Sequence, residues 1–79
     1  MHADICDPSD KAAVERFRKA LIQLGAKVED QTWGIGVDLY RVKIGDDELA
    51  VFSDTWSIDI QGDDELVKRV LQVYEHTLI

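Results

Sequence analysis

Cysteine and proline are nearly absent from this chain, which has one of each, and glycine occurs only five times in 79 residues. The single cysteine, Cys6, cannot form a disulfide within the chain, and a lone thiol fits a reducing compartment. The low glycine and proline content, together with 46% hydrophobic and 32% charged residues, is typical of a globular domain and not of a disordered segment. We therefore expect an ordinary folded domain without internal disulfides.

Long hydrophobic stretches are also missing. No apolar run approaches the roughly 20 residues that a membrane-spanning helix needs. The first ten residues, MHADICDPSD, lack the basic and apolar regions of a signal peptide. At 79 residues the chain has room for one core only. We expect a single soluble, cytoplasmic domain that covers residues 1–79 and does not enter a membrane.

Positive charge is scarce, because nine lysines and arginines stand against 16 aspartates and glutamates, for a net charge of −7. Such a surface repels phosphates, which speaks against non-specific binding of nucleic acids. Several bases nevertheless cluster early in the chain. The alternative hypothesis is therefore a nucleic-acid-binding domain that uses the basic side of the first helix. Its contact residues would be Arg16, Lys19 and Lys27.

β-branched and aromatic residues dominate residues 40–44, 48–52 and 56–60, and apolar character tends to recur at every second position, which predicts three strands. Two-residue turns at 45–46 and 53–54 would join them into hairpins, and a glycine at the first turn position suits a type II′ geometry. The first turn pairs Val42 with Leu49, and the second pairs Val51 with Trp56. Because directly opposed residues share a face, both hairpins predict the same inward-facing set: Tyr40, Val42, Leu49, Val51, Trp56 and Ile58.

The opposite face of this predicted sheet is mixed and not uniformly polar. Leu39 lies across from Phe52, with Val37 and Ala50 beside them, so an apolar patch remains on the side away from the core. Arg41, Lys43 and Asp59 border it. Exposed apolar atoms are common on small proteins, and the weak strand or the N-terminal residues could also cover this patch.

Two amphipathic helices are predicted, over residues 8–24 and 63–77. Asp7 can cap the first helix, and Gly25 is suited to end it. Asp63 is the expected N-cap of the second helix. The apolar stripe of the first helix contains Val14, Phe17, Leu21 and Leu24, and that of the second contains Leu66, Val67, Val70, Leu71, Tyr74 and Leu78.

Two segments have weaker patterns. Residues 26–32 predict a weak strand at a sheet edge or leading into a loop, and residues 1–6 fit an irregular lead-in better than a very short strand. Trp33, Gly34, Ile35 and Gly36 predict a turn in which Trp33 caps the core. The two glycines would alternatively allow a close backbone approach to a bound ligand.

Together these elements predict an α+β fold in two layers, with an antiparallel sheet of three to four strands and both helices on one face. The element order is α-β-β-β-β-α, with a weak first strand. Double-stranded RNA-binding domains share the order of a helix, three strands and a helix, but they present basic residues at the start of their last helix. This chain has Asp63, Asp64 and Glu65 there, so the comparison extends to topology alone.

No arrangement of nucleophile, base and orienting residue can be recognised. Cys6, His2 and His76 are the only candidates, and the dipole of the second helix accounts for His76 at its last turn. The acidic runs 46–48 and 63–65 do not match the ligand spacing of a calcium loop. We therefore expect no enzyme activity, no catalytic or metal-binding residues and no cofactor.

The remaining hypothesis is a non-catalytic protein-interaction module. Its contact residues would be Val37, Leu39 and Phe52 on the outer face of the sheet, flanked by Trp33. A homodimer formed through the sheet would cover this surface, and a basic surface on another protein is the alternative partner for an acidic domain.

Overall fold

The computed structural model describes residues 1–33 and 37–77. Its elements are β1 (His2–Cys6), α1 (Lys11–Gln23), β2 (Lys27–Trp33), β3 (Val37–Ile44), β4 (Asp47–Asp54), β5 (Ile58–Gln61) and α2 (Asp64–His76). The predicted α+β class with an antiparallel sheet is confirmed. The sheet has five strands, in the order β1-β5-β4-β3-β2, where three to four were predicted.

The additional strand is β1, and the prediction of an irregular lead-in over residues 1–6 was wrong. β1 pairs antiparallel with β5, so that Ala3 lies opposite Ile60 and Asp4 opposite Asp59. Ala3 and Ile5 are partly buried against the core, whereas Asp4 is exposed. A strand forms because β5 offers its free edge and the core accepts the apolar side chains of Ala3 and Ile5.

The hairpin of β3 and β4 has the predicted register, with Val42 opposite Leu49 and Tyr40 opposite Val51. Gly45 has a φ of 63°, and no residue other than glycine in the described ranges has a positive φ. In a type II′ turn only the first turn residue has a positive φ, whereas a type I′ turn needs a positive φ at both turn residues. The hairpin at Gly45 therefore fits the expected type II′ turn.

The register predicted for the next hairpin was wrong. Val51 lies opposite Ile60, not Trp56, because the turn is formed by the four residues 54–57 and not by residues 53–54. The Asp54 carboxylate accepts hydrogen bonds from the Ser57 amide (2.7 Å) and the Trp56 amide (2.8 Å), and the same bonds lower its pKa. The register is displaced by an even number of residues, so Ile58 and Ile60 still face the core.

Trp56 is the one predicted inward residue that this shift moves to the surface, where it is 82% exposed. We expect Trp56→Ser to change the free energy of unfolding by less than about 0.5 kcal/mol, as for an ordinary surface position. Urea unfolding followed by circular dichroism measures this. A loss of about 3 kcal/mol, as for a buried aromatic residue, would contradict the exposed position.

α1 begins later than predicted, at Lys11, because Asp10 and not Asp7 is its N-cap. The Asp10 carboxylate accepts a hydrogen bond from the Ala13 amide at 3.1 Å. Asp7 instead accepts bonds from Ser9 in the preceding turn. The predicted stop at Gly25 is confirmed: its φ is 75°, and the Gly25 and Ala26 amides donate to the carbonyl groups of Ile22 and Leu21, as in a Schellman motif.

α2 follows the prediction closely. Asp63 is its N-cap, and its side chain accepts a hydrogen bond from the Glu65 amide at 3.2 Å. The apolar stripe is buried in its first two turns, whereas Leu78 lies outside the described residues. β2 confirms the predicted weak strand and its place at the sheet edge. Residues 34–36, predicted as part of a turn, also lie outside the described ranges.

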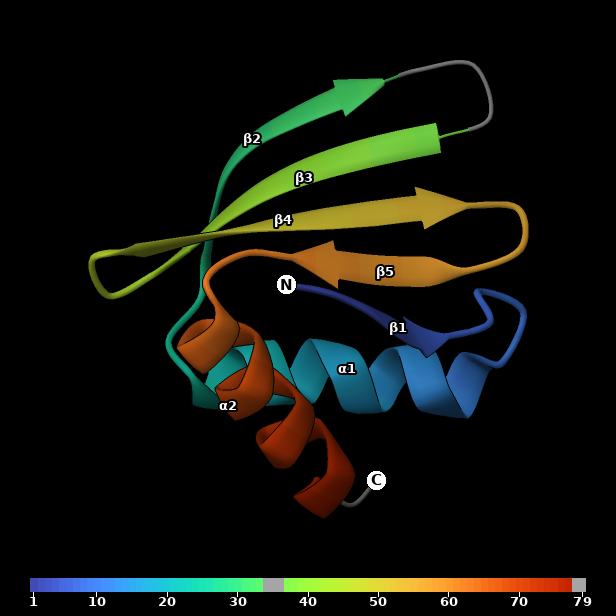
Figure 1. The fold of residues 1–79 in the computed structure, drawn as a ribbon. Coiled ribbons are helices and arrows are strands. Elements are labelled where there is room, and N and C mark those ends of the chain that lie inside the picture. Colours follow the sequence, from blue (N-terminus) through green and yellow to red (C-terminus); the bar gives the residue numbers. More distant parts are fainter. Residues whose placement is uncertain (34–36, 78–79) are drawn as a thin grey trace.

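One core cluster joins the sheet to both helices. Figure 1 shows α1 and α2 below β1 and β5, with β2 and β3 extending away from them. In the ranges described, no helix is long and apolar enough to cross a bilayer. The buried members of the cluster are Phe17, Val42, Ile44, Leu49, Val51, Ile58, Ile60, Leu66, Val67 and Val70.

Candidate interaction face

The side of the sheet that points away from the core cluster, here called the open face, has an apolar half and an acidic half. Leu39, Phe52, Asp59 and Asp4 lie directly opposite one another across β3, β4, β5 and β1. Side chains at opposed positions of antiparallel strands share a face. The open face therefore changes from apolar to acidic along one row of the sheet.

The apolar half contains the predicted contact residues. Leu39 lies opposite Phe52 as predicted, both are half-buried, and Val37 is 42% exposed. A shallow hollow of about 380 Å³ lies here, lined by Leu39, Arg41, Glu48, Leu49, Ala50, Phe52 and Gln61. Trp33 ends β2, and its side chain is outside the described part of the structure. The structure thus brings Val37, Leu39 and Phe52 together on two adjacent strands.

Charged residues border this patch at the end of the sheet near Gly45. Arg41 donates a hydrogen bond from Nε to Glu48 Oε1 at 2.7 Å, and this contact raises the pKa of Arg41. Lys43 lies opposite Glu48 on the same face. At this end of the apolar patch, the positive charges of Arg41 and Lys43 are therefore partly neutralised by the carboxylate of Glu48.

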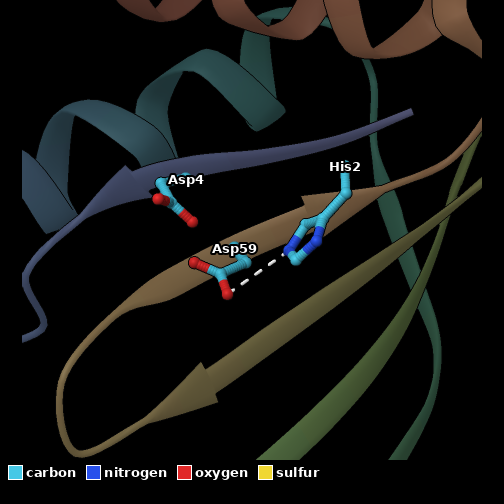
Figure 2. A group of neighbouring side chains, drawn as sticks. All are labelled: His2, Asp4 and Asp59. Atoms are coloured by element: carbon cyan, nitrogen blue, oxygen red, sulfur yellow. Dashed lines mark ion pairs between the residues drawn. The ribbon is translucent and has the colours of Figure 1, made fainter.

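The acidic half of the open face contains three groups that could ligate a metal ion. His2 and Asp4 come from β1, and Asp59 comes from β5 (Figure 2). His2 Nε2 lies 3.3 Å from Asp59 Oδ2, and the His2 ring lies 6.4 Å from that of Phe52. A hydrogen bond with Asp59, followed by repulsion from its charge, raises the pKa of Asp4. These three residues therefore adjoin the apolar patch.

A second apolar surface lies on the face of the sheet that carries the core cluster. A groove of about 360 Å³ runs between α1 and β3, with Val14, Leu21, Val28 and Tyr40 among its lining residues. Val28 belongs to the edge strand β2 and is 66% exposed. This groove therefore exposes part of the predicted core face.

The basic residues of the nucleic-acid hypothesis do not form one free surface. Arg16 donates from Nε to the Thr77 carbonyl at 3.1 Å and from Nη2 to the Tyr74 carbonyl at 2.9 Å. Its guanidinium lies 4.6 Å from the centre of the Tyr74 ring. Arg16 is therefore bound to the end of α2, whereas Lys19 is half-buried on α1 and Lys27 is exposed on β2.

Cys6 packs against the core cluster, and His76 lies in the last turn of α2. Burial, with smaller contributions from Asp10 and Asp7, raises the pKa of Cys6, which is the opposite of what an activated thiolate requires. His76 Nδ1 lies 2.7 Å from the Gln72 carbonyl oxygen, one turn earlier in α2.

The sequence interpretation missed the group formed by His2, Asp4 and Asp59. A signal was present, because His2 and Asp4 alternate with Ala3 and Ile5, as in a strand with one buried face. Four residues are too few for such a pattern to predict a strand, and nothing local indicates that β5 is its partner.

No protein-family model, no curated protein and no solved structure matches this chain.

Proposed function

We propose that this chain is a non-catalytic protein-interaction module, and that its open sheet face binds a second copy of the chain. The observation that carries the proposal is the opposed pair Leu39 and Phe52, which lies next to the exposed Val37 on the side away from the core. Apolar side chains grouped at the centre of a face, with charges at the border, are typical of contact surfaces. The proposal takes the molecule as two layers, with both helices on the other face of the sheet.

The pattern of charge favours a second copy over a basic partner protein. Arg41 and Lys43 lie on β3, at one side of the apolar patch, whereas Asp59 and Asp4 lie on β5 and β1, at the other side. A two-fold axis through the patch brings the cations of one copy toward the carboxylates of the other. Two-fold contacts of this kind are the commonest in homo-oligomers.

The size of the surface is also compatible with a dimer. A standard interface buries about 800 Å² on each partner, and the whole chain exposes 5242 Å². One face of a five-stranded sheet supplies area on this scale. The net charge of −7 opposes association of two copies at low salt, so we expect the dimer to persist or tighten at moderate salt.

Sedimentation over a range of protein concentrations tests the proposal. We expect a reversible dimer, and we expect Leu39→Glu to weaken it by roughly tenfold or more, because each 1.4 kcal/mol of lost contact energy is a factor of ten. Phe52→Ser should act in the same direction. An acidic residue is avoided at position 52 because Asp59 lies directly opposite.

Val28→Glu is the matched control, since it places the same charge on an exposed apolar position of the other sheet face. It should leave the dimer intact. A chain that is monomeric at every concentration would overturn the proposal. So would a dimer that Val28→Glu breaks and Leu39→Glu does not, because contact would then run through the groove beside α1.

A further inference from the structure

We propose that His2, Asp4 and Asp59 form a binding site for a divalent transition-metal ion, with Zn²⁺ as its representative, that fastens β1 to β5 on the open face. The three side chains each offer one ligand atom, and these atoms all lie within 4.8 Å of one another. Figure 2 shows the imidazole and the two carboxylates gathered between the two strands. This site does not depend on the proposed dimer.

The spacing of the ligand atoms is close to what a small divalent ion needs. With zinc bonds of about 2.0–2.2 Å at tetrahedral angles, two ligand atoms lie roughly 3.4 Å apart. The distance of 3.3 Å between His2 Nε2 and Asp59 Oδ2 already matches this value. Asp4 is exposed on the adjacent strand, so rotation of its side chain can bring its carboxylate into place.

An independent observation also indicates a missing partner at this position. Oδ1 of Asp59 is buried and, when Asp4 is ionised, has no hydrogen-bond donor among the described residues, although the Asp59 side chain as a whole is 18% exposed. Buried carboxylate oxygens in proteins are generally hydrogen-bonded or bound to a cation. A metal ion between β1 and β5 that is held by both oxygens of Asp59 would satisfy Oδ1 and reduce the repulsion between the two carboxylates.

The ligand chemistry selects a class of metal. One imidazole nitrogen with two carboxylate oxygens suits Zn²⁺ and its neighbours in the first transition row, whereas Mg²⁺ and Ca²⁺ prefer sites made of oxygen alone. Three protein ligands leave at least one position for water or another group. We therefore expect Zn²⁺ to bind in the presence of excess Mg²⁺.

Isothermal titration of the untagged, metal-free protein with Zn²⁺ tests the site. We expect one ion per chain, and we expect His2→Gln and Asp59→Asn each to weaken binding by at least roughly tenfold, the lower end of what lost metal-site interactions cost. His2 is 55% exposed, so His2→Gln should fold even if Asp59→Asn does not. Amide hydrogen exchange in β1 should slow when zinc is added, because the ion links β1 to β5.

His76→Gln and Cys6→Ser are the controls, because each removes another zinc-binding side chain and should leave the affinity unchanged. The titration is repeated with the Leu39→Glu variant, in which the proposed dimer is weakened. Metal binding is thereby measured separately from dimer formation. No binding, or binding that survives His2→Gln, would overturn the proposal. Zinc binding that depends on Cys6 and not on His2 would also overturn the proposal. So would zinc binding that leaves the amide hydrogen exchange of β1 unchanged.

Discussion

Ile60→Ala is expected to lower the free energy of unfolding by about 3 kcal/mol, because a large apolar side chain is removed from a site that cannot collapse. Ile60 is completely buried. It lies in β5 between Val51 of β4 and Ala3 of β1, so strands on both sides hold the surrounding backbone in place. A domain of this size has a total stability on the order of 4–12 kcal/mol, and the loss is therefore a large fraction of it.

Urea unfolding of the metal-free protein measures the effect, with circular dichroism as the signal. Ile22→Ala is the control, because Ile22 lies on α1 and is 60% exposed. It should change the free energy of unfolding by no more than about 0.5 kcal/mol. Equal effects of the two variants would show that β5 is not the centre of the core and that the pairing of β1 with β5 is wrong.

Arg16→Met is expected to cost about 2 kcal/mol, which is large for a residue that is only partly buried. Arg16 donates hydrogen bonds to the carbonyl groups of Tyr74 and Thr77, at the end of α2 where the last carbonyl groups lack a donor one turn later in the helix. Bonds from a charged donor are each stronger than neutral ones, and the position also favours a cation. Methionine keeps much of the apolar stem but removes every hydrogen bond that Arg16 donates to the end of α2.

Two further variants identify the cause of that loss. Arg16→Lys keeps the charge but lacks the planar group with several donors, so it should restore only part of the stability. Arg18→Met should have little effect, because Arg18 pairs with Glu15 on the exposed side of α1. If Arg16→Met were as mild as Arg18→Met, Arg16 would be free for phosphate binding, and the nucleic-acid hypothesis would gain support.

Local signals explain the parts of the fold that were predicted correctly. Both helices follow from their apolar periodicity, and Gly25 and Asp63 mark a helix end and a helix start through contacts within a few residues. The hairpin at Gly45 is equally local, because glycine adopts the positive φ that a two-residue turn of this kind requires. At the start of the first helix, Asp7 and Asp10 are both residues of the type that serves as an N-cap. The sequence does not select between them, and in the structure the N-cap is Asp10.

The errors arose where the alternation of apolar residues did not decide the outcome. Alternation predicts which residues of β5 face inward but not how far the strand slides, because an even displacement preserves the faces. The Asp54 carboxylate selected the longer turn, and Trp56 therefore lies outside the core. The role of Arg16 was not predicted for another reason: its hydrogen-bond partners lie about 60 residues later in the chain.

The amino-acid sequence by itself determined the two helices, the first hairpin and the apolar pair of Leu39 and Phe52 on the outer face, because backbone periods and turn preferences act over short distances. Tertiary structure alone decided that β1 would pair with β5, and thereby placed His2 and Asp4 beside Asp59. Pairing between strands that are far apart in the sequence depends on which edge and which core surface remain available after the other elements have packed. No local pattern contains that information.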